Sequence, residues 1–287
     1  MSLVNAKLMI KNAYKRKYAI PHININNLEW TKTVLLAAQE KRSPIIIATS
    51  EGAVKYMGGY NTVYGLVSSM IKDLKITVPV ALHLDHGTLQ GCFNAIEAGY
   101  TSVMYDGSHE EFKVNLKNTK KLLAKAIAKG VSVEAEVGSI GGEEDGVIGN
   151  GEIANPIEAK KMAAAGIDML AAGIGNIHGP YPASWKSLNF EAIKEITAKA
   201  KIGLVLHGGS GIPVDQIQKA ISLGVAKINV NTELQQANAT AITEFVESGK
   251  IKIGKNFDPR KIYFNANEAM KKVVFEKIAQ FNSENKA

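Results

Sequence analysis

The residues best suited to chemistry lie between Pro79 and Gly87, where an apolar run ends in two histidines, an aspartate and a glycine. The run predicts a buried strand. Because side chains alternate between the two faces of a strand, His83 and Asp85 share one face and His86 lies on the other. The two histidines therefore cannot both reach one metal while the chain is extended. Gly87 gives the backbone freedom to turn His86 toward Asp85, so we predict that His86 is a metal ligand and His83 a buried structural residue.

Eight runs of this kind, each followed by a helical pattern, repeat along the chain. The expected strands cover residues 19–24, 44–50, 79–87, 102–106, 131–137, 169–175, 203–207 and 226–230. The helices after them are expected near 28–41, 60–74, 89–98, 110–129, 156–165, 190–200, 214–223 and 233–247. Further helices are expected over 3–15 and 259–281.

The strand runs are rich in Val, Ile, Leu and Ala on both faces, which is typical of strands covered on both sides. They predict the α/β class and a single (βα)8 TIM barrel over residues 1–287, with an extra N-terminal helix and C-terminal helices. An open doubly wound sheet is the alternative. It is disfavoured because the first strand-to-helix turn, Ile25 to Asn27, lacks the glycines of a dinucleotide-binding fingerprint.

The composition favours a soluble protein of the cytoplasm. The chain has 287 residues, 46% of them hydrophobic, and one cysteine, Cys92, so an internal disulfide is excluded. The N-terminus has no signal-peptide core, and no apolar run approaches the roughly 18 residues that cross a bilayer. The formal charge is +7, but the lysines are scattered and Lys15 to Lys17 is the only run of three basic residues, which argues against nucleic-acid binding.

In a barrel of this kind the active site lies at the carboxyl ends of the strands. The predicted ends are polar: Asn24, Ser50, Asp85 with His86, Asp106, Glu136, Gly175 to His178, His207 with Gly208, and Asn229 to Thr232. Three imidazoles among them, His86, His178 and His207, would leave a tetrahedral metal one open position, which is the arrangement of catalytic zinc.

Carboxylates beside such a metal have several uses. Asp85 could exchange a proton with a substrate hydroxyl, while Asp106 and Glu136 could hold a second metal or orient the ligands. Glu134 shares a face with Glu136, and for it the pairing of a buried carboxylate with Lys227 is an equal alternative.

Two glycine- and asparagine-containing segments predict a phosphate site. The segment His207 to Gly211 runs toward a helix whose first turn carries Pro213, and Asn229 to Thr232 follows the last strand. Phosphate sites in barrels gather in these two loops. The glycine-rich segment 138–155 is long for a barrel loop and predicts a mobile lid.

A metal and a phosphate site leave two chemistries: hydrolysis by metal-bound water, or polarisation of a carbonyl to stabilise an enolate. The residues alone do not separate them. A Schiff-base mechanism is disfavoured because Lys227, the one candidate lysine within a strand, lies at the start of its strand.

Six blocks in order give the chain a family resemblance: Leu82 to Gly87, Ser132 to Gly138, Gly141 to Asp145, His178 to Tyr181, Leu206 to Gly211, and Ile228 to Thr232. Over essentially its whole length the chain resembles the class II, metal-dependent fructose-bisphosphate aldolases. The resemblance implies a lyase of glycolysis that reversibly cleaves fructose 1,6-bisphosphate to dihydroxyacetone phosphate and glyceraldehyde 3-phosphate through a zinc-stabilised enediolate.

The resemblance also implies roles for individual residues. Zinc would be held by His86, His178 and His207, with a second metal position at Asp106 and Glu136. Asp85 would be the proton donor, and Glu144 would handle the proton at the carbon that becomes nucleophilic. Dihydroxyacetone phosphate would meet Gly179, Gly208, Gly209, Ser210, Asn229, Val230, Asn231 and Thr232.

The other end of the substrate would meet Asn24 and Ser50, and Arg260 would bind its distal phosphate from a neighbouring subunit, so that the protein is at least a homodimer. A monovalent cation, Na⁺ or K⁺, would lie beside the phosphate loops. Two alternatives stay open: an aldolase for tagatose 1,6-bisphosphate, and a barrel that binds a phosphorylated ligand without catalysis. The presence of both Asp85 and Glu144 argues against the second.

Overall fold

The computed structural model describes residues 3–144 and 147–287. Eight parallel strands close into a barrel in the order β1-β11-β10-β8-β5-β4-β3-β2, which confirms the predicted TIM barrel. They are β1 (Ile20–Asn24), β2 (Ile45–Thr49), β3 (Val80–Gly87), β4 (Ser102–Tyr105), β5 (Ser132–Val137), β8 (Met169–Ala172), β10 (Leu204–Leu206) and β11 (Val225–Val230).

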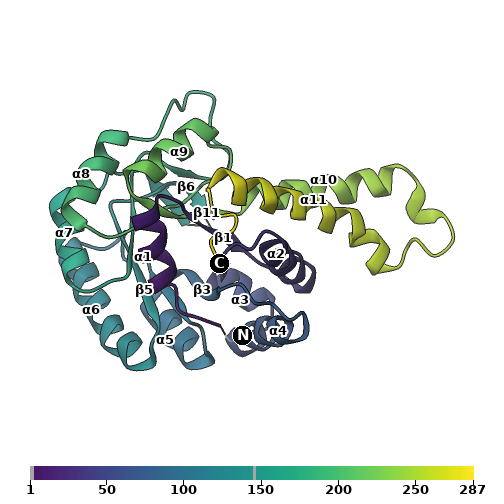
Figure 1. The fold of residues 1–287 in the computed structure, drawn as a ribbon, viewed down its shortest axis with the longest axis horizontal. Helices are drawn as coiled ribbons and strands as arrows, with labels where there is room; N and C mark the ends of the chain where they lie inside the picture. Colours follow the sequence, from purple (N-terminus) through teal and green to yellow (C-terminus); the bar gives the residue numbers. More distant parts are fainter. Residues whose placement is uncertain (1–2, 145–146) are drawn as a thin grey trace.

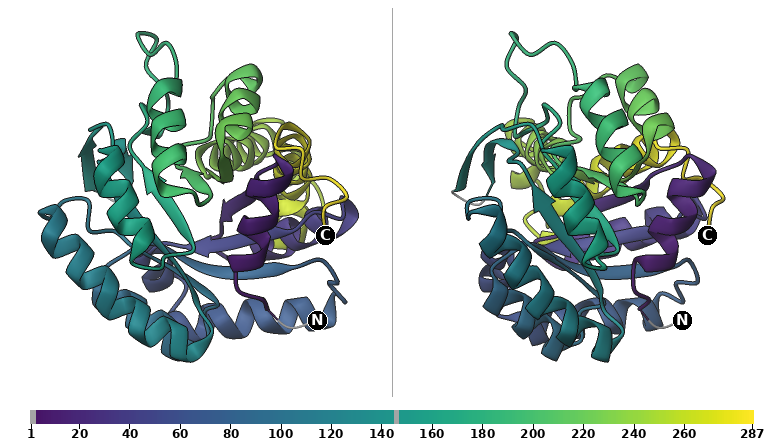
Figure 2. Two further views of the ribbon diagram at one scale, coloured as in Figure 1. Left: turned by 60° about the vertical axis from the view of Figure 1, so that its left-hand side comes forward. Right: turned by 90° about the vertical axis from the view of Figure 1, so that its left-hand side faces the viewer.

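Helices surround these strands (Figures 1 and 2). They are α2 (Leu28–Glu40), α3 (Glu51–Tyr56), α4 (Tyr60–Asp73), α5 (Leu89–Ala98), α6 (Phe112–Lys129), α7 (Pro156–Ala164), α8 (Phe190–Ala200), α9 (Val214–Leu223) and α10 (Thr232–Glu247). Several begin at a polar residue whose side chain accepts a backbone N–H of the first turn, as Asn27, Thr88 and Asn155 do. The repeated strand–helix units thus follow the predicted segments, with α3 as an unpredicted addition.

The barrel is closed at its amino end by α1 (Lys7–Arg16), which begins four residues later than expected. Ala6, Met9 and Ile10 pack on lumen residues that include Ile20 and Val205, and the Ala6 N–H donates to Ser132 Oγ at 3.0 Å. This apolar plug leaves the carboxyl ends of the strands as the open face.

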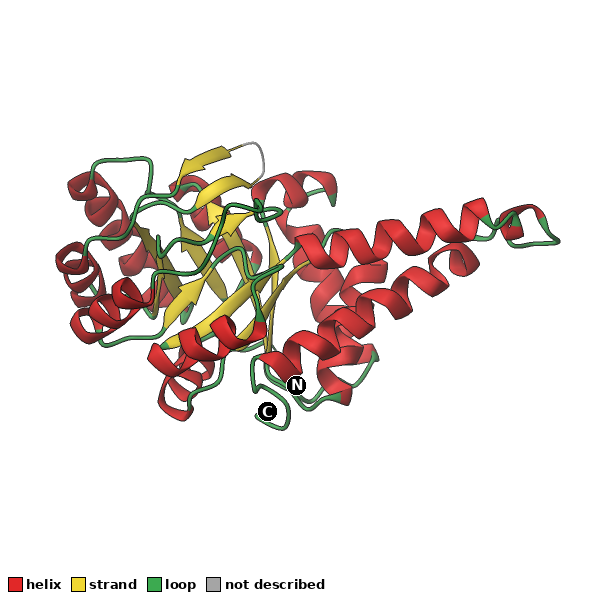
Figure 3. Ribbon diagram, turned by 90° about the horizontal axis from the view of Figure 1, so that it is seen from above, coloured by secondary structure: helices red, strands yellow, loops and turns green. Residues whose placement is uncertain are grey.

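A helical arm projects from the barrel (Figure 3). It consists of α10, the short 3-10 helix η1 (Lys250–Lys252) and α11 (Pro259–Gln280), whose later turns pack along α2. Ile253, Phe257 and Phe264 are exposed near its far end. The predicted C-terminal segment 259–281 forms one long helix, α11. In the described residues, no helix combines the length and the apolar character that crossing a membrane requires.

The long segment after β5 contains strands, which the sequence interpretation missed. β6 (Gly141–Glu144) and β7 (Val147–Asn150) pair as an antiparallel hairpin, and β6 also pairs with the two-residue strand β9 (Ile177–His178). His178 consequently lies in this small sheet beyond the end of β8, and not on a barrel strand as predicted. The reason is that the chain turns after Ala172 and re-pairs with the hairpin.

Candidate active site

His86 reaches the barrel mouth through an unusual backbone conformation. Its φ is 47°, in the left-handed region, and the pairing of β3 with β4 shifts register between Leu84 and Gly87. A non-glycine residue in this region is uncommon and often belongs to a functional site. The predicted turn therefore occurs, but at His86 itself. Gly87 serves a different purpose, because a Cβ there would lie 2.6 Å from Leu84 Cδ2.

The three predicted imidazoles converge. One ring nitrogen from each of His86, His178 and His207 lies within 4.8 Å of the others, and the His86 Nε2 to His207 Nδ1 distance is 2.9 Å. The outer nitrogens of two rings are held by carboxylates: His86 Nδ1–H donates to Asp106 Oδ2 at 2.7 Å, and His207 Nε2–H to Glu134 Oε1 at 2.9 Å. These bonds direct the inner lone pairs of both rings toward one point, which fits a shared divalent cation.

The surrounding charges also favour a cation at this point. Burial would lower the pKa of His86, but the hydrogen bond to Asp106 and the charges of Asp85 and Asp106 outweigh it and raise the pKa to about 10. Burial and the two neighbouring imidazoles hold the pKa of His178 well below its usual value. A neutral His178 keeps a lone pair for a metal.

A second group of possible ligand atoms adjoins the first. His86, Asp106 and Glu136 offer atoms within 4.8 Å of one another. Glu136 is buried, and its Oε2 has no hydrogen-bond partner among the described residues. Burial, followed by the negative charge of Asp106, raises the pKa of Glu136 well above its usual value. Such an orphaned oxygen suits either a proton or a second cation.

Asp85 is 2% exposed beside the imidazole cluster. Asn24 Nδ2 donates to its Oδ2 at 3.0 Å, and Asn229 Nδ2 donates to its Oδ1 at 3.3 Å. Burial would raise the pKa of Asp85, but His22, His86 and His207 outweigh it and hold that pKa well below its usual range. A carboxylate with defined partners on both oxygens is suited to exchange a proton at a fixed position.

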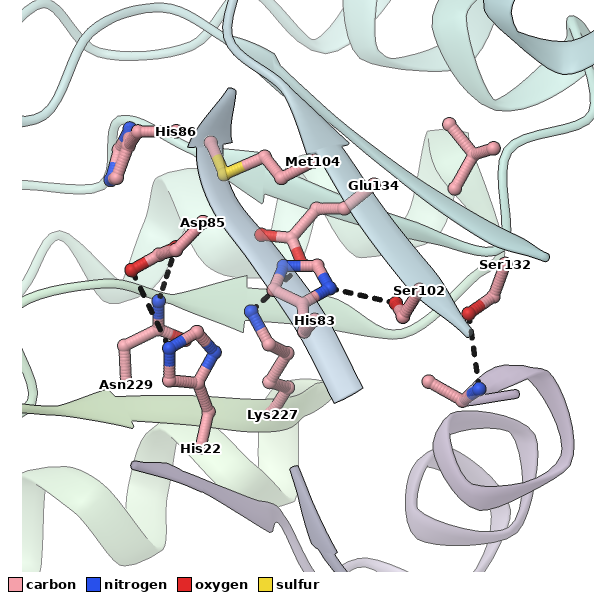
Figure 4. A network of polar contacts seen from close by, with 12 residues as sticks. His22, His83, Asp85, His86, Ser102, Met104, Ser132, Glu134, Lys227 and Asn229 are labelled. Carbon is pink, nitrogen blue, oxygen red and sulfur yellow. Dashed lines mark hydrogen bonds and ion pairs between the residues drawn. The ribbon is translucent and has the colours of Figure 1, made fainter. Parts of the chain in front are cut away.

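Deeper in the barrel than Asp85 and the imidazole cluster, the lumen holds a buried charge network (Figure 4). Lys227 Nζ donates to Glu134 Oε2 at 2.8 Å, so the predicted alternative of pairing is present. Glu134 also holds His207, which the sequence did not reveal, because β5 and β10 are not adjacent in the barrel. His83 is buried, as predicted, and its Nδ1 lies 2.7 Å from the Ser102 hydroxyl oxygen.

A narrow cavity of about 20 Å³ lies beside the imidazole cluster, and six of the eight residues predicted to bind phosphate line it. Its lining is Asn24, Asp85, His178, Gly179, His207, Gly208, Ser210, Asn229, Asn231 and Thr232. Gly208 has φ 64°, and a Cβ there would lie 2.0 Å from Ile177 O. The helix that begins at the cavity is α10, at Thr232, and not α9, as the position of Pro213 had suggested.

Two residues of the set predicted to bind phosphate, Gly209 and Val230, make other contacts. The Gly209 N–H donates to Asn229 O at 2.8 Å, so it is engaged within the protein in this conformation. Val230 is fully buried in the apolar core, because it lies on the outward face of β11. Neither residue lines the narrow cavity.

A larger cavity of about 350 Å³ lies on the carboxylate side of the cluster. It is lined by Glu51, Gly52, His86, Gly87, Thr88, Asp106, Ser108, His109, Glu136, Ser139, Ile140, Gly149 and His178. His86 and His178 thus stand beside the larger opening, and His178 also borders the narrow one. Ser50 is not part of this lining but directly precedes Glu51 and Gly52, and it caps α3 by accepting the Ala53 N–H at 3.1 Å.

The β6–β7 hairpin is tied to the imidazole cluster through the backbone. Gly142 pairs with His178, and with φ 85° a Cβ at Gly142 would lie 2.2 Å from His178 O. Glu144 ends β6 and pairs with Val147 at the turn of the hairpin. The side chain of Glu144 and all of Asp145 lie outside the described residues.

Comparison with known proteins agrees with this geometry. The family described as "Fructose-bisphosphate aldolase class-II" matches residues 4–286. The chain belongs to this family. It is 56% identical to the fructose-bisphosphate aldolase of Ureaplasma parvum, covering 99% of this chain and 98% of that one, and 52% identical to that of Mycoplasma pneumoniae, covering 99% and 100%. A putative fructose-1,6-biphosphate aldolase from Coccidioides immitis has the same fold, with a TM-score of 0.87 at 30% identity over 98% of this chain and 97% of that one.

As a class II aldolase, the chain brings together most of the residues predicted for the site. Arg260 is not among them: its side chain is 88% exposed near the start of α11, where it pairs with Asp258 at 2.6 Å. Arg260 is the second residue of α11, and this helix begins at the far end of the arm, away from the barrel (Figure 1). His22, which contacts Asn24 and Asp85, was given no role in the site from the sequence. Its place two residues before Asn24 on an inward strand face was the available signal.

Proposed function

We propose that this class II aldolase reversibly cleaves fructose 1,6-bisphosphate to dihydroxyacetone phosphate and glyceraldehyde 3-phosphate, with His86, His178 and His207 holding zinc. The observation that carries the proposal is the convergence of three imidazoles beside Asp85, between a narrow polar cavity and a wider one. When bound, zinc would polarise the substrate carbonyl and stabilise the negative charge that develops at its oxygen. We treat residues 1–287 as one catalytic domain.

The protein groups around this point have separate tasks in the proposal. Asp85 takes the proton of a substrate hydroxyl during cleavage and returns it during condensation. Asn24 and Asn229 hold the Asp85 carboxylate in place by donating to its two oxygens. Glu144, carried by β6, moves the proton at the carbon that becomes nucleophilic.

The phosphate nearest the metal would bind where the narrow cavity meets the start of α10. Gly179, Gly208 and Ser210 line this cavity, and Asn231 and Thr232 open the helix there. The N–H groups at a helix start and its partial positive charge suit a phosphate. Gly209 shapes the loop through the close approach of Asn229 O, and Val230 holds β11 in the core. The Na⁺ or K⁺ expected beside these loops stays a prediction.

Three further assignments complete the proposal. Asp106 and Glu136 would serve a second metal position, which the orphaned Glu136 Oε2 supports. Asn24 and Ser50 would meet the distal half of the substrate. We also infer at least a homodimer, in which the exposed Arg260 on the arm binds the distal phosphate in a neighbouring mouth. The cytoplasm is the proposed location, and the buried free thiol of Cys92 suits it.

The direct test is a coupled assay of cleavage on fructose 1,6-bisphosphate and on tagatose 1,6-bisphosphate, with and without a zinc chelator. We expect preferred turnover of the fructose isomer and loss of activity with the chelator. Activity that survives full zinc removal would contradict the metal mechanism. Preferred turnover of the tagatose isomer would keep the mechanism and change the substrate.

A further inference from the structure

His22 lies at the centre of the polar contacts around Asp85. It is fully buried on the inward face of β1, beside Asn229 in the strand register. Its Nε2 lies 3.1 Å from Asn24 Oδ1 and 3.4 Å from Asp85 Oδ2, whereas its Nδ1 has no hydrogen-bond partner among the described residues. Figure 4 shows the ring beside Asp85 and Asn229.

Only one arrangement of hydrogen-bond donors and acceptors among His22, Asn24 and Asp85 pairs every donor with an acceptor. An ionised Asp85 can only accept, so Asn24 must present its NH₂ group to it, as observed. Asn24 Oδ1 then faces His22 and can also only accept. The ring must therefore carry its proton on Nε2. The other tautomer would set a lone pair against Asn24 Oδ1 and leave a buried Nδ1–H unpaired.

A cation site is the competing explanation, because His22, His83 and Asp85 offer atoms within 4.8 Å of one another. Two observations oppose it. The ammonium of Lys227 lies in the same network, and its charge contributes to lowering the pKa of both imidazoles. The His22 nitrogen nearest Asp85 is already engaged with Asn24. The ring is better explained as a hydrogen-bond donor.

We propose that His22 is a positioning residue for the aldol reaction, which donates through Nε2–H to Asn24 and thereby fixes the Asn24 amide and Asp85 Oδ2. This inference rests on the proposed function. With the proton on Nε2, the unpartnered Nδ1 is a bare acceptor, and no buried N–H of this ring is left without a partner.

The test uses variants that differ in the reach of one N–H group. The side-chain nitrogen of glutamine reaches about as far as Nε2 of histidine, whereas that of asparagine matches Nδ1. His22→Gln should therefore keep cleavage of fructose 1,6-bisphosphate close to wild type. His22→Asn and His22→Leu should lose kcat by about 10- to 100-fold, the cost of a misplaced catalytic group. Zinc content and melting temperature are measured for each variant.

A half-reaction separates positioning from general damage. Exchange of the dihydroxyacetone phosphate C–H proton with deuterated solvent needs the metal and Glu144 in the proposed mechanism, but not the proton donated by Asp85. His22→Asn and His22→Leu should keep this exchange while cleavage falls. His83→Gln is the matched control, because His83 is equally buried but bonds to Ser102. It should change exchange and cleavage in parallel.

Every outcome of these experiments either supports or overturns the proposed role of His22. Equal kcat in all three His22 variants, or exchange and cleavage lost together in His22→Asn, would overturn the role of His22. If His22→Leu does not fold, the Gln and Asn pair still decides. The ring ¹⁵N shifts of wild-type protein should show the Nε2–H tautomer, and the Nδ1–H tautomer would overturn the inference. Wild-type protein that cleaves neither sugar bisphosphate would refute the proposed function, whereas an active wild type with unaffected His22 variants would refute only this inference.

Discussion

The end of the barrel lumen nearest α1 is filled by apolar side chains, among them Ile20, Ile46, Ala81 and Met169, and α1 closes it. Beyond it, toward the mouth, paired ionisable and amide groups fill the lumen: Lys227 and Glu134 form a network in the middle, and Asp85 with its amide partners lies at the mouth. The side chains named at both ends are almost fully buried.

The two ends of the same strands therefore contribute differently: the apolar end mainly to stability, and the end nearest the mouth to chemistry. Burial of the apolar end removes hydrocarbon from water, which stabilises the fold without further conditions. Burial of the charged end is favourable only while each group keeps its partner, because an unpaired charge in the interior is very costly. Changes at the mouth should therefore act on turnover, changes in the network on both properties, and changes at the plug on stability.

The largest expected effect is that of Asp85→Asn, which keeps the shape of the side chain and removes the group that transfers the proton. We expect kcat to fall by about 10²- to 10⁴-fold, the usual contribution of general acid–base catalysis. Binding of dihydroxyacetone phosphate, measured by calorimetry, should persist. Unchanged turnover would remove Asp85 from the mechanism.

Lys227→Met tests the charged network. It leaves Glu134 with its charge and without the ammonium that lies 2.8 Å from it. The free energy of unfolding should fall by about 3–5 kcal/mol, as when one partner of a buried pair is removed. Urea denaturation measures this loss. A second change in the same chain, Glu134→Gln, should restore part of the stability, and failure to restore any would show that the pair is not coupled.

Ile46→Ala tests the apolar plug. It removes a fully buried side chain next to α1 and leaves a cavity, so the free energy of unfolding should fall by about 2–5 kcal/mol. The kcat of the folded protein at low temperature should stay near wild type. A selective loss of kcat in this variant would mean that the two ends of the lumen are not independent.

The pH dependence of stability gives a smaller effect. Burial and the charge of Lys227 lower the pKa of His22 from 6.5 to about 4, and burial also lowers that of His83. Between these pH values the unfolded chain binds protons that the folded protein does not, so stability falls as the pH drops from 6.5 toward 4. Each histidine contributes at most about 1.4 kcal/mol per pH unit.

The comparison of wild type with His22→Gln isolates one of these rings. Urea denaturation of the metal-free proteins at pH 7 and pH 5 should show a smaller loss of stability in the variant. Identical losses would mean that His22 does not resist protonation in the folded state.

The sequence predicted the barrel well because its signals are local. Apolar runs alternating with helical patterns define each strand–helix unit, and the polar residue that ends each strand falls at the mouth by the geometry of the fold. Asp85, His86 and His207 were found in this way, and they do lie together.

The remaining features depend on contacts between distant segments. Glu134 reaches His207 across 73 positions, and this depends on strands that are close in space without being neighbours in the sheet. His178 was assigned to a barrel strand because Met169 to Gly175 is a continuous apolar run, whereas its pairing with Gly142 is set by the hairpin. The left-handed φ of His86 has only a weak signature in the residue type, because histidine is enriched in that region but adopts it in a minority of cases.

The central claim is that the mouth of this barrel is a zinc-dependent aldolase site built on His86, His178 and His207. The most direct measurement follows turnover of fructose 1,6-bisphosphate while zinc is removed and then returned in steps, with bound zinc counted at each step. Turnover that rises in proportion to the tightly bound zinc, and that is absent together with the zinc in His178→Ala, is the predicted result. Full turnover in zinc-free protein, or undiminished zinc binding and turnover in His178→Ala, would contradict the claim.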